Sequence, residues 1–268
     1  MKHTLLVILL AVQASLAQDY KPQPVTALLG AFDEEVKLVQ QSLKDPVTKT
    51  INGLTFTTGL IGTHRVVVAE TGIGKTNAAM TTAFMLAYFQ PERVIFTGIA
   101  GGVNPDLQPG DIVIAKQTGY HDYHSVTFDQ KPTIQTRDAI SKQMNPAYFP
   151  ADSALLQKAS TAAKKTDFER IPVTSRPPSV IIGTVVTGDE FVNSQTRVDQ
   201  LRADHKADAT EMEGAAVAQV CHQVHVPCVV IRSLSDKANS NARQDMLTFY
   251  KIAARNSAKL VLAIVNSL

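Results

Sequence analysis

Carboxyl groups occur in three short segments of this chain, and they are the side chains best suited to acid–base chemistry. Gly30–Val36 contains three consecutive acids, the last of them Glu35; in Ala209–Ala216 two acids flank a methionine; and an apolar run ends at Asp236. Singly, such acids are most often helix caps, residues that complement the helix dipole, or turn residues. At the carboxyl end of strands in an open α/β sheet, where ligands bind, a carboxylate could instead activate water and would repel phosphate.

A glycine-rich segment, Ala69–Thr76, fits a loose form of the phosphate-binding loop. In such a loop Lys75 and the backbone N–H groups would cradle phosphates, with Thr76 on magnesium. The first glycine of the motif is absent. The N-terminal residues also predict export, and an exported protein meets little ATP. The segment is therefore interpreted as a tight turn that starts a helix, with positive φ at Gly72 or Gly74 and a solvated lysine.

Two further segments have the composition of ligand-binding turns. Thr97–Gly102 is a run of small residues, which lets a ligand or a neighbouring loop approach the backbone closely. Val186–Val192 is a strand end that presents an aromatic ring, and Arg232 lies inside an otherwise apolar run. Each signal is weak when taken alone, because crowded turns and core residues produce the same patterns.

Composition and length indicate a folded globular protein with a packed core and exclude several other classes. The 268 residues are 44% hydrophobic, with 26 Lys and Arg against 24 Asp and Glu, a net charge of +2. This balance argues against disorder and gives no pull toward nucleic acid. Cys221 and Cys228 make no disulfide framework and, like the histidines, lack metal-ligand spacing. They are predicted core residues, with a bridge as the alternative, and neither a metal nor an organic cofactor is predicted.

The first 17 residues resemble a secretory signal. Lys2 precedes the apolar run Thr4–Val12, and Ser15 and Ala17 fit the small-x-small cleavage rule. The run is shorter than the roughly 20 residues that a membrane span needs, although an uncut anchor is the alternative. We therefore predict a signal peptide at residues 1–17, a mature chain of residues 18–268 without membrane contact, and export to the periplasm or medium.

Strand-like and helical segments alternate from Val25 onward. Nearly continuous apolar strands predict a sheet covered on both faces. The predicted strands are Val25–Leu29, His64–Ala69, Arg93–Thr97, Asp111–Ala115, Ser179–Val186 and Cys228–Arg232. The predicted helices are Asp33–Leu43, Thr76–Tyr88, Ser153–Lys165, Glu213–Gln223 and Gln244–Leu268. We expect one three-layer α/β domain, with Tyr120–Pro150 as a long polar excursion.

Taken in order, the short motifs resemble those of the methylthioadenosine/S-adenosylhomocysteine nucleosidases, within the wider nucleoside phosphorylase family. The resemblance covers about Val25 to Leu268. The matching segments are Gly30–Val36, Thr71–Lys75, Gly98–Gly102, Gly110–Val113, Tyr120–Asp122, Gly188–Phe191, Glu211–Glu213 and Ser235–Asp236. It implies a three-layer αβα domain with a central mixed, twisted sheet, a homodimer, and a purine nucleoside as substrate. It also implies that the glycine turn belongs to the scaffold.

The resemblance assigns roles to individual side chains. Asp236, assisted by Ser235, would protonate the purine N7, and Glu35 would act as base for the attacking water. Arg232 would orient Glu35 or the water. The expected substrate-binding residues are Glu213 on the ribose hydroxyls, Glu211 and Met212 beside it, Phe191 stacked on the purine, the Val192 backbone at its edge, Ile99 near the water, and Phe32 and Met246 around the thioether tail.

The resemblance leaves the reaction partly open. Hydrolysis of adenine thionucleosides is the expected activity, and phosphorolysis is its close rival. Family members commonly carry a serine where this chain has Ile99, and the acidic segment around Glu35 stands where phosphorylases place an arginine. Both differences favour water over phosphate. An exported purine-binding protein without catalysis is the third alternative, and the presence of both a candidate acid and a candidate base argues against it.

Overall fold

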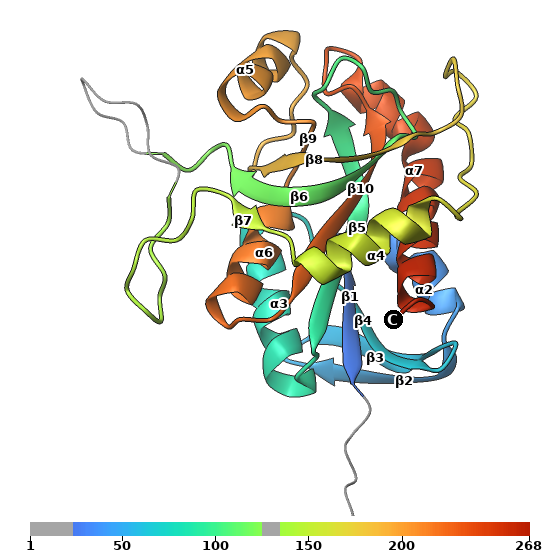
Figure 1. The fold of residues 1–268 in the computed structure, drawn as a ribbon, viewed down its shortest axis with the longest axis vertical. Helices are drawn as coiled ribbons and strands as arrows, with labels where there is room; N and C mark the ends of the chain where they lie inside the picture. The colour runs from blue at the N-terminus through green and yellow to red at the C-terminus, as the bar shows by residue number, and fades with distance from the viewer. Residues whose placement is uncertain (1–23, 125–134) are drawn as a thin grey trace, which may run out of the picture.

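A ten-stranded mixed sheet packed between two layers of helices forms the protein (Figure 1). The computed structural model describes residues 24–124 and 135–268. The strands are β1 (Val25–Gly30), β2 (Lys44–Ile51), β3 (Leu54–Ile61), β4 (His64–Glu70), β5 (Arg93–Gly102), β6 (Ile112–Tyr120), β7 (Phe149–Pro150), β8 (Val180–Thr187), β9 (Ala209–Glu211) and β10 (Cys228–Asp236). The helices are α2 (Asp33–Gln41), α3 (Lys75–Phe89), α4 (Ser153–Ala163), α5 (Gln195–His205), α6 (Gly214–Gln223) and α7 (Ala242–Val265).

The apolar strands bury both of their faces, which confirms the predicted three layers. Along β1, Ala27 and Leu29 belong to one hydrophobic cluster, which also contains residues of α3 and α6. Leu28 belongs to a second cluster, with residues of α2, α4 and α7. Because successive side chains on a strand point to opposite faces, a continuous apolar run fits only a sheet covered on both sides.

The strand order brings five carboxyl ends to one region. The sheet runs β10-β6-β8-β9-β5-β1-β4-β3-β2, and β10 also pairs with β5, so that five strands form a closed ring. β5 is parallel to both β1 and β10, and β8 is parallel to β9. The acidic and small-residue segments identified in the sequence lie at the carboxyl ends of five strands: β1, β5, β8, β9 and β10.

A hairpin and a helix were absent from the predicted elements. β2 and β3 form an antiparallel hairpin at the sheet edge, and nearly all of β2 is exposed, so its pattern lacks buried apolar residues. The signal that could have revealed it is Asn52-Gly53, which has φ of 50° and 83° and joins the strands as a hairpin turn. Helix α5 is mostly polar and begins after its N-cap, Ser194.

Several other predictions can be compared with the described residues. α3 begins at Lys75, and both Gly72 and Gly74 have positive φ, which confirms the glycine turn. Cys221 and Cys228 are buried and unbridged. The predicted signal peptide and part of the polar excursion lie outside the described residues. Within residues 24–124 and 135–268, no helix is both long and apolar enough to cross a membrane.

Candidate active site

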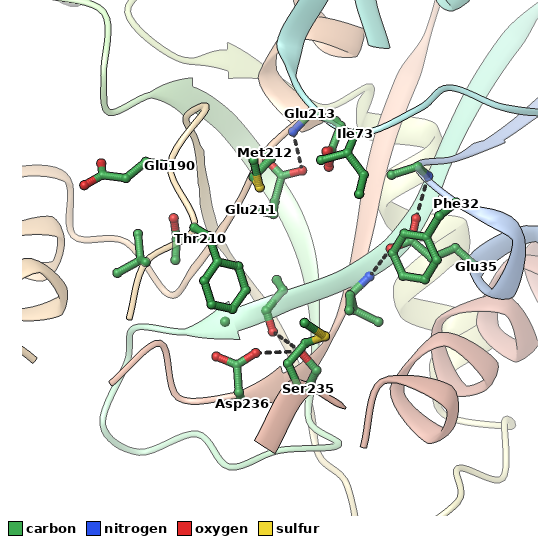
Figure 2. A pocket seen from close by; sticks show the side chains of 17 residues that line it. Phe32, Glu35, Ile73, Glu190, Thr210, Glu211, Met212, Glu213, Ser235 and Asp236 are labelled. Carbon is green, nitrogen blue, oxygen red and sulfur yellow. Dashed lines mark hydrogen bonds between the residues drawn. The ribbon is translucent and has the colours of Figure 1, made fainter. Parts of the chain in front are cut away.

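A pocket opens where the strand ends converge, and acidic and apolar side chains line it (Figure 2). All of the site residues predicted from the sequence line this pocket except Arg232, which is completely buried behind it. The pocket therefore collects segments that are far apart in the chain. The lining residues are Ala31, Phe32, Glu35, Ile73, Ile99, Ala100, Gly101, Glu190, Phe191, Val192, Thr210, Glu211, Met212, Glu213, Ser235, Asp236 and Met246.

Sequence reasoning did not single out six of these residues. Ala100 and Gly101 belong to a small-residue turn that the sequence identified only as a segment of close backbone approach, and Ala31 stands in a segment singled out for its acids. Ile73 stands in the glycine turn, which was assigned to the scaffold. Nothing in the pattern distinguishes Glu190 or Thr210 from ordinary surface or strand residues, because their position depends on how loops meet in space.

Asp236 ends β10 where the pairing with β5 shifts register, between Leu234 and Asp236. One carboxylate oxygen accepts from the Ser235 hydroxyl at 2.6 Å and the other from the Ala238 backbone N–H at 2.7 Å. Burial raises the pKa of Asp236 to about 6, despite the opposing effect of these two hydrogen bonds. The side chain can therefore hold a proton close to neutral pH.

Glu35 lies in the first turn of α2 and is buried. Its oxygens accept from the backbone N–H groups of Ala31, at 2.5 Å, and Ile99, at 2.8 Å. Burial raises its pKa, whereas the charge of Arg232 and these N–H groups act to lower it. Gly98 is needed beside it, because a Cβ there would stand 2.5 Å from a Glu35 oxygen and 1.8 Å from Arg232 Nη1.

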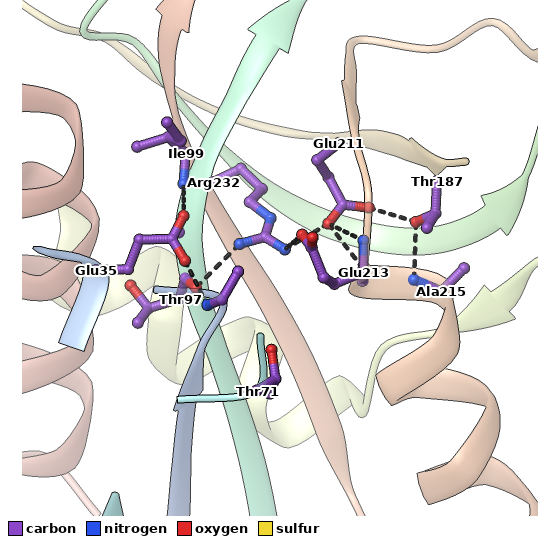
Figure 3. A network of polar contacts seen from close by, with 12 residues as sticks. Glu35, Thr71, Thr97, Ile99, Thr187, Glu211, Glu213, Ala215 and Arg232 are labelled. Carbon is purple, nitrogen blue, oxygen red and sulfur yellow. Dashed lines mark hydrogen bonds and ion pairs between the residues drawn. The ribbon is translucent and has the colours of Figure 1, made fainter. Parts of the chain in front are cut away.

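A single arginine balances the acids behind the pocket (Figure 3). Arg232 donates to a Glu211 oxygen and to the Thr97 carbonyl at 2.9 Å, and it lies 3.6 Å from a Glu213 oxygen. Within the described part of the chain, no hydrogen bond joins it to Glu35. Arg232 therefore acts on Glu35 through its charge, while its direct contacts hold Glu211 and the carbonyl of β5.

Glu211 and Glu213 lie at the junction of β9 and α6 and have different surroundings. Glu211 accepts from the Thr187 hydroxyl, the Gly214 N–H and Arg232, so its lone pairs are used within the protein. Glu213 accepts only the Gly74 N–H, at 2.8 Å, among the hydrogen bonds of the described residues. Burial and the neighbouring Glu211 charge raise the pKa of Glu213. Of the two, Glu213 has the free capacity to bind hydroxyl groups.

Replacing Arg232 by methionine is expected to lower the free energy of unfolding by about 3 kcal/mol. The change leaves the buried carboxylates of Glu211 and Glu213 without their cation, and breaking a buried ion pair costs about that much. Urea unfolding at pH 7.5 measures the effect. As the control, Arg255→Met removes the half-exposed pair with Glu169 and should cost less than about 1 kcal/mol. Equal effects of the two changes would contradict the electrostatic role of Arg232.

The described residues offer no obvious cation site. Across residues 24–124 and 135–268, no group of three or more His, Cys, Asp and Glu side chains is arranged to hold a metal ion. The polar groups of the pocket are instead positioned by hydrogen bonds within the protein. The arrangement suits the exchange of protons with a neutral ligand.

Comparison with known proteins places the chain in a family. The model of the protein family described as Phosphorylase superfamily matches residues 25–266. The 5'-methylthioadenosine/S-adenosylhomocysteine nucleosidase of Bacillus cereus (strain G9842) is 36% identical over 247 residues, covering 90% of this chain and 98% of that protein. The nucleosidase of that name from Colwellia psychrerythraea 34H, solved in complex with adenine, has a TM-score of 0.81 at 33% identity and covers 93% of this chain and 98% of its own.

A differently named hydrolase is also similar. The futalosine hydrolase of Helicobacter pylori strain 26695 has a TM-score of 0.79 at 29% identity, covering 91% of this chain and 98% of its own. The matches span nearly the full length of each relative, so the likeness is that of whole proteins. The chain therefore belongs to the Phosphorylase superfamily and, within it, to the family of the 5'-methylthioadenosine/S-adenosylhomocysteine nucleosidases.

Proposed function

We propose that this protein hydrolyses the N-glycosidic bond of adenine thionucleosides, methylthioadenosine and S-adenosylhomocysteine, and releases adenine. The observation that carries the proposal is that one pocket collects Glu35, Glu213 and Asp236 from three distant segments. The names of the relatives and the adenine complex of one of them support the same substrate class.

Asp236 acts on the departing purine. Cleavage of the bond leaves negative charge on the base, and a proton supplied to N7 relieves it, as in other general acid catalysis. The pKa of about 6 keeps part of this carboxyl protonated near neutral pH. The Ser235 hydroxyl holds the carboxyl group in place, since it lies 2.6 Å from one of its oxygens.

Glu35 and Glu213 act on the sugar side. Glu35 takes a proton from the water that attacks the anomeric carbon, while Glu213 accepts hydrogen bonds from the ribose hydroxyls. The ribosyl centre develops oxocarbenium character, so buried carboxylates beside it stabilise the positive charge that forms. Arg232 contributes indirectly, because it fixes Glu211 at the strand end from which Met212 and Glu213 follow.

The remaining pocket residues fit the base and the tail of such a nucleoside. Phe191 stacks on the purine and the Val192 backbone contacts its edge. Phe32 and Met246 supply an apolar wall for the thioether substituent, consistent with pockets that bind ligands mainly through apolar contact. One similar structure is named a futalosine hydrolase, so futalosine belongs among the substrates to be compared.

Hydrolysis is favoured over phosphorolysis by the charge of the pocket. Among the described residues that line it, five are acidic and none is lysine or arginine. A phosphate dianion entering this pocket would meet like charges, and Arg232 behind the pocket is completely buried and already bound to Glu211. Water, being neutral, carries no such penalty.

The test is a product assay with methylthioadenosine, S-adenosylhomocysteine, adenosine and futalosine, each with and without phosphate. We expect adenine from the first two at rates that phosphate leaves unchanged within about twofold. A rate that rises with phosphate and yields ribose 1-phosphate from adenosine would support the phosphorylase alternative. Binding of adenine without cleavage of any nucleoside would support the non-catalytic alternative.

We further propose that the protein is exported and forms a homodimer. The signal-like residues 1–17 support export. For the dimer, support comes from α3, which exposes the large apolar side chains of Met80 and Tyr88. Burial of these side chains against a second copy of the chain would contribute to the stability of a dimer.

A further inference from the structure

The glycine turn touches two parts of the substrate pocket and has no role in the chemistry proposed above. Its residues Gly72–Lys75, here the glycine loop, follow β4 and end at the first residue of α3. The Gly74 N–H donates to a Glu213 oxygen at 2.8 Å, and the Lys75 N–H donates to an Asp189 oxygen at 2.8 Å. The loop therefore contacts both the ribose-side acid and the segment that carries Phe191.

Lys75 also uses its side chain for this contact and is not the solvated lysine that the sequence predicted. Its Nζ lies 2.6 Å from an Asp122 oxygen and 3.7 Å from an Asp189 oxygen. The same Asp122 oxygen accepts the Asp189 N–H at 2.8 Å. Partial burial acts to raise the pKa of Asp122, but Lys75 and this N–H hold it below its usual range. The ammonium group thus reduces the repulsion between two neighbouring carboxylates.

The segment Gly188–Val192, here the base loop, depends on such contacts because it has no regular secondary structure. Arg197 secures one side of it through Glu190, at 2.9 Å, on the half-exposed face. The Lys75 cluster secures the other side through Asp189. Phe191, which follows Glu190, is 47% exposed, so its own packing does little to fix its position.

We propose that Lys75 is a positioning residue for the nucleobase: it holds the base loop against the glycine loop and so keeps Phe191 and Glu213 in register with each other. This inference rests on the proposed function in that it takes Phe191 and Glu213 as the contacts to base and ribose. Without the ammonium group, Asp122 and Asp189 repel each other, and the base loop moves away from the pocket.

The conformation of Gly74 permits the contact between the glycine loop and Asp189. Its φ is +95°, which side chains other than glycine rarely adopt, and a Cβ there would stand 3.1 Å from an Asp189 oxygen. The turn thereby brings two successive N–H groups toward two different carboxylates. A phosphate-binding role for Lys75 is disfavoured, because its charge is already balanced by acids.

The test compares Lys75→Met with Lys75→Arg and with a matched control, Lys158→Met. Lys158 is also half-buried and donates at 2.7 Å, but to the Ser267 carbonyl in the C-terminal tail. The measurements are kcat and KM for methylthioadenosine, the dissociation constant of adenine by calorimetry, and hydrogen exchange of the peptide that covers the base loop.

We expect Lys75→Met to raise KM and the adenine dissociation constant about tenfold, with kcat lowered less than about threefold, as suits the loss of a charge-assisted contact. Exchange in the base loop should become faster. Lys75→Arg should restore most of the affinity, and Lys158→Met should change neither constant more than about twofold.

Unchanged KM, adenine affinity and base-loop exchange in Lys75→Met would overturn the proposal, as would a loss confined to kcat. If Lys75→Met fails to fold, Asp122→Asn decides, since it keeps the shape of the side chain and should raise both constants about threefold. A wild-type protein that cleaves no nucleoside would refute the proposed function instead. Adenine affinity and base-loop exchange would then still test the role of Lys75.

Discussion

Replacing Asp236 by asparagine is expected to lower kcat for methylthioadenosine about a thousandfold, within the range for loss of a general acid. Asparagine keeps the size of the side chain and can still accept the Ala238 N–H, but it has no acidic proton for the purine. The pH profile gives a second readout. The wild type should lose activity as pH rises above about 6, where Asp236 ionises, and the variant should lack this limb.

The same variant should be more stable than the wild type at pH 7.5. Because the folded-state pKa of Asp236, about 6, lies above its ordinary value of 3.8, the native state binds more protons between these values, and the stability of the wild type falls as pH rises through that window. Two pKa units correspond to about 3 kcal/mol. Urea unfolding should give nearly equal free energies of unfolding for variant and wild type at pH 4, and a value about 3 kcal/mol higher for the variant at pH 7.5.

Two results would contradict the role of Asp236. One is a variant that retains more than about a tenth of wild-type kcat. The other is a basic limb that survives the substitution, which would assign that limb to a different group. Ser235→Ala provides the graded control: it removes the hydrogen bond but leaves the acid, so we expect a smaller loss than in Asp236→Asn.

Replacing Glu35 by glutamine should also lower kcat by about a thousandfold, because it removes the base that activates the attacking water. Glutamine cannot take a proton from water. Both Glu35 oxygens accept backbone N–H groups, so the amide nitrogen of glutamine leaves either Ala31 or Ile99 without an acceptor. Because burial raises the pKa of Glu35, the wild type should also lose activity as pH falls through that raised value.

The control for Glu35→Gln is the binding of adenine, which the proposed function assigns to the Asp236 end of the pocket. Calorimetry should give a dissociation constant within about twofold of the wild type, and the acidic limb of the pH profile should be missing. A variant with near-normal kcat would show that another group activates the water. A variant that fails to bind adenine would show that Glu35 supports the pocket as a whole.

The layers of this fold were predictable because they depend on local patterns. The apolar runs of β1, β4, β5 and β10 are continuous since helices cover both faces of the sheet. Strand β2 was not predicted because it is almost entirely exposed, and without a buried face its sequence shows no apolar pattern. Helix α5 is likewise mostly polar and packs mainly through Val198 and Leu201.

The site was predictable in its members but not in its contacts. Glu35, Glu213 and Asp236 stand in motifs whose order along the chain resembles one family, and the strand order explains why they meet. The hydrogen bond between Arg232 and Glu211 joins residues 21 positions apart. The contact of Lys75 with Asp189 joins residues 114 positions apart. Such pairs depend on loop geometry, for which a sequence alone carries no periodic signal.

Cleavage in ¹⁸O-labelled water tests the central claim most directly. Methylthioadenosine is incubated with the wild type in phosphate-free buffer, and the adenine and the sugar are analysed by mass spectrometry. We expect stoichiometric adenine and one ¹⁸O atom in the sugar, with both products formed about a thousandfold more slowly by Glu35→Gln and by Asp236→Asn. Absence of adenine, or cleavage that either variant carries out at the wild-type rate, would contradict the account.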